Sequence, residues 1–230
     1  MVPERYQRNL GSIGIEGQAR LLESKVAIVG VGGLGGIALE LLLRLGVGAL
    51  AVIDGDAFSE SNVNRQLLSQ ITNMGAAKVE VARQRAESVN PSTKMETYRV
   101  RATEGNLAEM INGSHVVVDG LDDIPTRYAV QRAAKGLGIP FVHGAVAGFW
   151  GQVMTIFPED EGLELIYGSE AEPIPGDERD LGTPCVTPAM VASVQVAEVI
   201  KVLLGWKDVI RNRLYVLNLK NPASGFVDMA

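Results

Sequence analysis

The segment Val26-Ala27-Ile28-Val29-Gly30-Val31-Gly32-Gly33-Leu34-Gly35 decides the fold of this chain. Its first four residues are apolar, as in a buried strand, and a G-x-G-x-x-G turn follows them directly. The apolar residues 36–45 then indicate a buried helix. A strand, a glycine turn and a helix in this order present free backbone N–H groups and a helix dipole to phosphate. The segment therefore predicts a nucleotide-binding unit.

Outward from this unit, apolar strand patterns alternate with helical ones, which is typical of parallel strands joined by crossover helices. Further strands are expected at residues 50–53, 95–100, 116–119 and 139–142, and helices at 78–89 and 125–137, the last with Asp123 able to cap it. The fold class predicted is α/β, a Rossmann-like doubly wound sheet that is mainly parallel.

The pattern changes after His143. Residues 152–157 alternate as a strand, 159–184 form an acidic loop without periodicity, and 188–204 indicate a helix. Residues 213–219 and 225–229 predict a hairpin, so the sheet is expected to end in a C-terminal antiparallel extension. Residues 1–230 are interpreted as a single domain.

The composition fits one globular domain and excludes disorder, collagen and coiled coil: 230 residues, 47% hydrophobic, 21% charged and 5% aromatic. The single cysteine, Cys185, excludes an intramolecular disulfide and a cysteine zinc cage, and there are only two histidines. Structural zinc is not expected.

The charge is concentrated in one block. Of a net charge of −6, nine acids lie in residues 159–180 against one base, Arg179, and the remainder carries +2. We expect no nucleic-acid partner. The uncharged stretch 26–39 contains five glycines and is too short to span a bilayer, and the N-terminal residues lack the apolar run of a signal peptide, so we expect no membrane association and a cytoplasmic location.

Candidate ligands for a nucleotide follow the second predicted strand. Asp54 and Asp56 lie about 20 residues beyond the glycine turn, where an acid can accept hydrogen bonds from ribose hydroxyls. A nicotinamide dehydrogenase would explain the chain equally well to this point.

The next residues favour a triphosphate. Its negative charge is neutralised by cations and usually by a metal ion, and Arg65 and Lys78 can supply the cations. The amides of Asn62 and Gln66 lie beside Arg65. Asp122 follows a predicted central strand and could hold Mg²⁺ together with the phosphates. ATP and Mg²⁺ are therefore the expected cofactors.

The chain resembles the MoeB/ThiF/HesA family of ubiquitin-activating-like adenylyltransferases from near its N-terminus to its final hairpin. The landmarks that carry the resemblance are Arg5-Tyr6-Gln7-Arg8, the turn from Gly30 through Gly32 and Gly33 to Gly35, Asp54-Gly55-Asp56, Asn62-Val63-Asn64-Arg65-Gln66, Lys78-Val79-Glu80, Asp119-Gly120-Leu121-Asp122-Asp123, Gly151-Gln152-Val153 and Gln195-Val196-Ala197-Glu198-Val199-Ile200-Lys201. Eight landmarks in order are far more specific than the glycine turn alone.

The resemblance implies that ATP activates the C-terminal carboxylate of a small ubiquitin-like sulfur-carrier protein, giving an acyl-adenylate and pyrophosphate. It implies that Asp54 and Asp56 hold the ribose, that Arg65 and Lys78 bind the phosphates, and that Asp122 binds Mg²⁺. Residues 1–145 would be the nucleotide-binding half, and 146–230 the carrier-binding half with the acidic loop 159–184. Arg8 would reach the neighbour's ATP across a homodimer.

The chain departs from the family pattern in lacking the two Cys-x-x-Cys pairs that usually bind zinc, and in having Asp122-Asp123 where Asp-Asn is frequent. Cys185 precedes a predicted helix, which suits either a nucleophile or a packing residue. Two alternatives remain open: a related activator of another acceptor, such as the tRNA threonylcarbamoyladenosine dehydratase branch, and a non-catalytic nucleotide-binding module.

Overall fold

The computed structural model describes residues 2–170, 181–221 and 223–229. In this part of the chain one sheet has the strand order β3-β2-β1-β4-β5-β6-β7-β8. The strands are β1 (Lys25–Val29), β2 (Ala49–Ile53), β3 (Lys94–Tyr98), β4 (Val116–Asp119), β5 (Phe141–Ala147), β6 (Trp150–Ile156), β7 (Arg213–Asn218) and β8 (Ala223–Asp228). β1 to β5 pair in parallel and β5 to β8 pair antiparallel, so the predicted fold class is confirmed.

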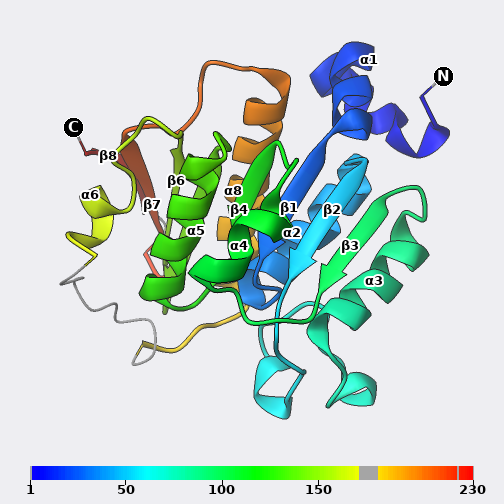
Figure 1. The fold of residues 1–230 in the computed structure, drawn as a ribbon, viewed down its shortest axis with the longest axis horizontal. Helices are drawn as coiled ribbons and strands as arrows, with labels where there is room; N and C mark the ends of the chain where they lie inside the picture. The colour runs from blue at the N-terminus through cyan, green and yellow to red at the C-terminus, as the bar shows by residue number, and fades with distance from the viewer. Residues whose placement is uncertain (1, 171–180, 222, 230) are drawn as a thin grey trace.

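Helices cover both faces of the sheet (Figure 1). The helical elements are η1 (Glu4–Tyr6), α1 (Gln7–Glu23), α2 (Gly33–Leu45), η2 (Glu60–Asn62), η3 (Ile71–Asn73), α3 (Lys78–Val89), α4 (Glu104–Ile111), α5 (Ile124–Gly136), α6 (Glu164–Tyr167) and α8 (Val186–Leu204). α4 and α5 lie on one face, and α2 and α8 lie on the other.

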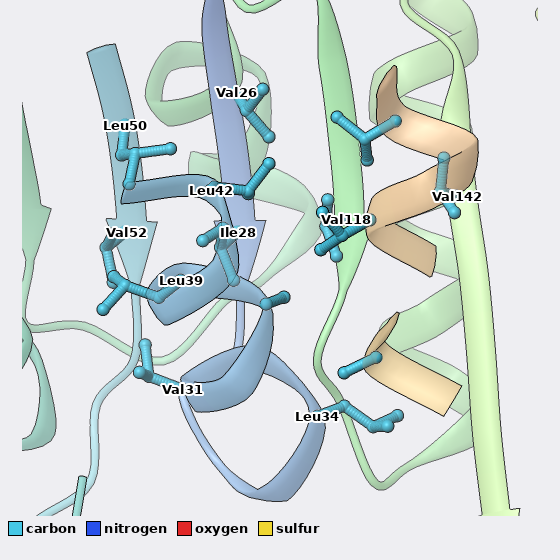
Figure 2. Packing of buried hydrophobic residues seen from close by; sticks show 14 of the residues in the cluster. Val26, Ile28, Val31, Leu34, Leu39, Leu42, Leu50, Val52, Val118 and Val142 are labelled. Atoms are coloured by element: carbon cyan, nitrogen blue, oxygen red, sulfur yellow. The ribbon is translucent and has the colours of Figure 1, made fainter. Parts of the chain in front are cut away.

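The alternation of side chains along β1 explains the two hydrophobic cores. Val26 and Ile28 point toward α2 and α8, whereas Ala27 and Val29 join the cluster under α4 and α5. Figure 2 shows the first of these clusters, in which Leu39 of α2 lies against the sheet. Because β1 is buried on both faces, its sequence is a continuous apolar run.

The helix α8 is long and apolar enough to cross a membrane by length and composition. Its residues Val191, Val196 and Val199 are buried in the same cluster as α2. This is the environment of a core helix packed on a sheet.

Several element boundaries differ from the sequence predictions. β3 ends at Tyr98 and not at residue 100, and β5 continues to Ala147 because it pairs with β6 through a tight turn at Gly148. The helices α2 and α8 begin at Gly33 and Val186, slightly before the predicted starts. Pairing of Asn218 with Ala223 closes the final hairpin earlier than expected.

Among the described residues, three α-helices were not predicted. α1 contains Gly11, Gly14 and Gly17, which weaken its helical pattern, and it kinks at Gly14. α4 begins after Thr103, whose backbone N–H donates to Asn106 Oδ1, a capping signal that could have revealed it.

The third unpredicted helix corrects the expectation of a structureless acidic loop. α6 lies inside residues 159–184. Asp160 and Glu159 in the same segment form ion pairs with Arg211. Residues 171–180 of the predicted loop lie outside the described residues.

Candidate active site

A cavity of about 900 Å³ lies at the carboxyl ends of the parallel strands. The turns after β1, β2, β3 and β4 line it. The chain leaves β1 toward β2 on one side and β4 lies on the other, so this is the topological switch point where doubly wound sheets bind ligands. The volume is that of a small-molecule site.

The glycines of the first turn have different roles. Gly30 has φ +87°, and a Cβ atom there would lie 2.6 Å from the carbonyl oxygen of Gly120. Gly32 and Gly33 line the cavity at the start of α2, where no side chain caps the helix. Gly35 lies beneath the turn, since its Cβ would lie 1.8 Å from Gly30 O. The uncapped N–H groups of α2 therefore face a cavity that can hold phosphate.

Asp54 joins the first two turns. Its Oδ2 accepts a hydrogen bond of 2.7 Å from Val31 N–H, and its Oδ1 accepts one of 2.8 Å from Asp56 N–H. Burial raises the pKa of Asp54, and the nearby Lys78 ammonium opposes that shift. The side chain of Asp56 is 76% exposed and is the more accessible acceptor for a ribose hydroxyl. Both acids line the cavity.

The two predicted cations also line the cavity. Lys78 is the first residue of α3, and its Nζ lies 3.1 Å from Asp56 Oδ2 and 3.9 Å from Asp54 Oδ2. Arg65 Nη1 donates to Ser61 O at 2.9 Å and to Asn64 Oδ1 at 3.1 Å.

The two predicted amides differ in position. Asn62 does not line the cavity; its Oδ1 accepts from Ser59 N–H, and its carbonyl accepts from Arg65 N–H, so it shapes the turn that carries Arg65. Gln66 lines the cavity and is buried, and its Oε1 has no hydrogen-bond partner among the described residues.

Asp122 is exposed and lines the cavity on the side formed by the turn after β4. No hydrogen bond or ion pair engages its carboxylate in the described part of the chain, so both oxygens are available to a ligand. No group of three or more His, Cys, Asp or Glu side chains that could hold a metal occurs in the described ranges. A magnesium ion here would depend on Asp122 together with phosphate oxygens and water, which is the usual arrangement for Mg²⁺ with nucleotides.

Arg8 and Cys185 do not line the cavity. Arg8 is exposed and follows Tyr6, which packs against Gly46 and accepts a hydrogen bond from Asn90 at the amino ends of the strands. In Figure 1 the N-terminal segment and α1 lie at the end of the sheet away from the strand arrowheads. Cys185 is exposed at the N-cap of α8.

Sequence reasoning missed a buried polar cluster behind Asp122. It consists of Asp119, Arg127, His143, Gln152 and Tyr167. Arg127 also lines the cavity although it is only 1% exposed. Asp119 and Gln152 stand in landmarks of the family resemblance, but no local pattern joins the five residues, because they come from β4, α5, β5, β6 and α6. The turn at residues 99–102, which also lines the cavity, was missed because β3 was expected to include part of it.

The ThiF family model matches residues 6–229. The chain belongs to the ThiF family. SAMP-activating enzyme E1 of Haloferax volcanii is 37% identical to it over 215 residues, which cover 92% of this chain and 79% of that protein. Sulfur carrier protein adenylyltransferase of Thermus thermophilus is 38% identical over 212 residues, covering 88% and 78%. The predicted family and the adenylyltransferase class are confirmed for this ThiF-family chain.

Solved structures support the same fold. The crystal structure of E. coli MccB with ATP has a TM-score of 0.85 at 20% identity, and the similarity covers 99% of this chain and 72% of MccB. That of E. coli tRNA N6-threonylcarbamoyladenosine dehydratase has a TM-score of 0.74 at 23% identity, covering 88% and 94%. At such identities the likeness concerns the ThiF-type fold alone.

Proposed function

We propose that this chain uses ATP to adenylate the C-terminal carboxylate of a small ubiquitin-like sulfur-carrier protein. The observation that carries the proposal is the cavity, which places Arg65 and Lys78 beside the uncapped start of α2 and Asp122 on the opposite wall. The relative named sulfur carrier protein adenylyltransferase, which matches most of this chain, supports the choice of acceptor, and so does the one named SAMP-activating enzyme E1.

In this proposal the triphosphate lies over residues 32–35, where the N–H groups of α2 and the helix dipole favour negative charge. Arg65 and Lys78 neutralise the phosphates, and the ribose hydroxyls donate to Asp54 and Asp56. The arriving phosphates compete with Asp56 for Lys78, because its ammonium is held by that carboxylate in the structure. Asp122 would hold Mg²⁺, which neutralises phosphate charge when bound.

The chemical step needs no protein nucleophile. A carboxylate oxygen of the carrier attacks the α-phosphorus, the bond from that phosphorus to the bridging oxygen breaks, and pyrophosphate leaves with its electron pair. The residues of the cavity have to orient the two reactants and stabilise charge, which is what a glycine turn and two cations provide.

Pyrophosphate–ATP exchange in the presence of purified sulfur-carrier proteins tests this function. We expect exchange that depends on a carrier with an intact C-terminal carboxylate. Asp122→Ala should reduce the exchange rate by on the order of 100-fold or more, because it removes an electrostatic contact at the reacting phosphates.

The matched control for Asp122→Ala is Glu60→Ala, which removes another exposed acid from the lining of the same cavity. It should leave exchange close to that of the parent. Equal rates in Asp122→Ala and the parent would remove Asp122 from the mechanism. A parent that binds ATP but exchanges with no carrier would instead indicate another acceptor.

We further propose a homodimer in which Arg8 serves the partner's ATP. Its place in the N-terminal segment at the amino ends of the strands supports an action in trans, since the cavity of its own subunit lies at the opposite ends. Mixing inactive Arg8→Ala chains with inactive Lys78→Ala chains should restore activity to about a quarter of all sites after full exchange of subunits. No recovery after demonstrated exchange would show that Arg8 does not act across an interface.

A further inference from the structure

A buried polar cluster lies directly behind the turn that carries Asp122. Asp119 and His143 are fully buried, and Asp119 Oδ2 lies 2.7 Å from His143 Nδ1. The same oxygen lies 3.2 Å from Arg127 Nε. Tyr167 extends the cluster, because its hydroxyl lies 3.4 Å from Arg127 Nη1 and 3.3 Å from His143 Nε2. One buried carboxylate thus fixes both an arginine and a histidine.

Two members of this cluster hold the backbone of Leu121 from both sides. Asp119 Oδ1 accepts a hydrogen bond of 3.0 Å from Leu121 N–H. Arg127 Nη2 donates to the Leu121 carbonyl at 2.8 Å. The peptide group that leads into Asp122 therefore accepts a bond from a charged side chain that is itself fixed.

The residue after Asp122 is fixed as well. Asp123 is the N-cap of α5, and its Oδ1 accepts a hydrogen bond of 2.9 Å from Thr126 N–H. Asp122 thus lies between two anchored neighbours while its own carboxylate remains exposed to the cavity. Such an arrangement orients a ligand group before the ligand arrives.

We propose that Arg127, fixed by Asp119 and Tyr167, is a positioning residue that orients Asp122 toward the metal–nucleotide complex. The inference rests on the proposed function, in which Asp122 is the acid that faces Mg²⁺. Stability alone does not account for such a cluster, because buried ion pairs contribute little compared with apolar residues of similar size. Its members converge on the turn after β4, where the Asp122 carboxylate faces the cavity and has no partner in the described residues.

Two tyrosine variants separate positioning from simple packing. Tyr167→Phe removes the hydroxyl that contacts Arg127, His143 and Gln152. Tyr128→Phe is the matched control: its hydroxyl donates to Gly168 O at 2.7 Å and so also joins α5 to the end of α6, but outside the cluster. Both variants keep the ring and each loses one hydroxyl.

The measurement is the equilibrium affinity for ATP by calorimetry, with Mg²⁺ and with EDTA, and the readout is the ratio of the two affinities. Tyr167→Phe should lower this ratio by between about twofold and tenfold, because Arg127 itself loses one hydrogen bond. Tyr128→Phe should leave the ratio unchanged. Asp122→Ala should lower the ratio to the value expected when no carboxylate at this position contributes to Mg²⁺-dependent binding of ATP.

Arg127→Lys provides a second measurement. A single ammonium cannot replace the fork that reaches both Asp119 and Leu121 O, so the ratio should fall further than in Tyr167→Phe. If Arg127→Lys does not fold, the comparison of Tyr167→Phe with Tyr128→Phe still tests the proposal.

Equal ratios in Tyr167→Phe, Tyr128→Phe and the parent would overturn the proposal. So would an equal fall in both tyrosine variants. Because the readout is binding and not turnover, a parent that adenylates no carrier would refute the proposed function while leaving this test interpretable.

Discussion

The two walls of the cavity are built in opposite ways. The glycine wall, residues 30–35 with 54–56, is held by backbone bonds and by one carboxylate, Asp54, between neighbouring turns. The Asp122 wall, residues 120–127, is held by side chains from strands and helices far apart in the sequence. The first wall offers backbone N–H groups to phosphate, and the second offers a carboxylate whose direction depends on a buried ion pair. The local sequence motif is sufficient to build the glycine wall, whereas the Asp122 wall forms only when the whole fold is assembled.

The two walls meet where the backbone of Gly30 packs closely against the backbone of Gly120. A Cβ on Gly120 would lie 2.2 Å from Gly30 O, and one on Gly30 would lie 2.6 Å from Gly120 O. The two turns therefore pack too closely for a side chain to fit between them at either position. This contact explains why the two walls form one site although they are stabilised differently.

The largest expected effect concerns the base of the glycine wall. Gly35→Ala places a Cβ 1.8 Å from Gly30 O, so the turn and α2 must separate. The free energy of unfolding should fall by about 3 kcal/mol or more, measured by urea denaturation.

The control for this change is Gly36→Ala, one residue along α2, where the nearest atom to the new Cβ lies 3.6 Å away. Alanine in a helix is favoured over glycine by roughly 0.5–1 kcal/mol, so this variant should match or exceed the parent in stability. A similar fall in the free energy of unfolding of both variants would mean that any substitution at the start of α2 is destabilising. The contact between Gly35 and Gly30 O would then not be the cause.

A smaller effect distinguishes the Asp122 wall by its pH dependence. Burial lowers the pKa of His143, although the Asp119 carboxylate opposes the shift. Below the ordinary pKa of about 6.5 the unfolded chain binds a proton at this histidine that the folded chain does not bind. Stability should therefore fall as the pH drops from 7 toward 5, with a slope of up to about 1.4 kcal/mol per pH unit.

Thermal or urea unfolding across this pH range checks the prediction. His143→Gln should flatten the slope, and His115→Gln, which alters an exposed histidine, should retain it. A slope that persists unchanged in His143→Gln would assign the pH dependence to other groups.

The smallest expected effect on pyrophosphate exchange concerns Cys185, which belongs to neither wall. It is exposed at the start of α8, and Thr183 and Pro188 on either side of it line the cavity. Cys185→Ser should leave pyrophosphate exchange unchanged, because the ATP groups lie elsewhere, and should abolish only the later transfer from the adenylated carrier. Exchange and carrier-linked product measured on the same samples separate the two steps. Loss of exchange itself would show that the cysteine supports the structure of the site.

The sequence by itself determined the features that depend on local spacing. The continuous apolar runs predicted β1 and β4, because strands buried on both faces need no polar alternation. The glycine turn, Asp54 and Lys78 were found because each is placed by its own strand end or helix start. The acid cap at Asp123 and the proline after it marked α5 for the same reason.

Only the tertiary structure decided which buried charges meet. Asp119 and His143 are separated by 24 residues and become neighbours because β4 pairs with β5. Arg127 is an ordinary helical residue in sequence, and its 1% exposure follows from packing of α5 against the sheet and α6. Hydrogen bonds between distant side chains leave no periodic signal in the chain, whereas turns and strands do. The glycine wall was therefore predictable, and the support of Asp122 was not.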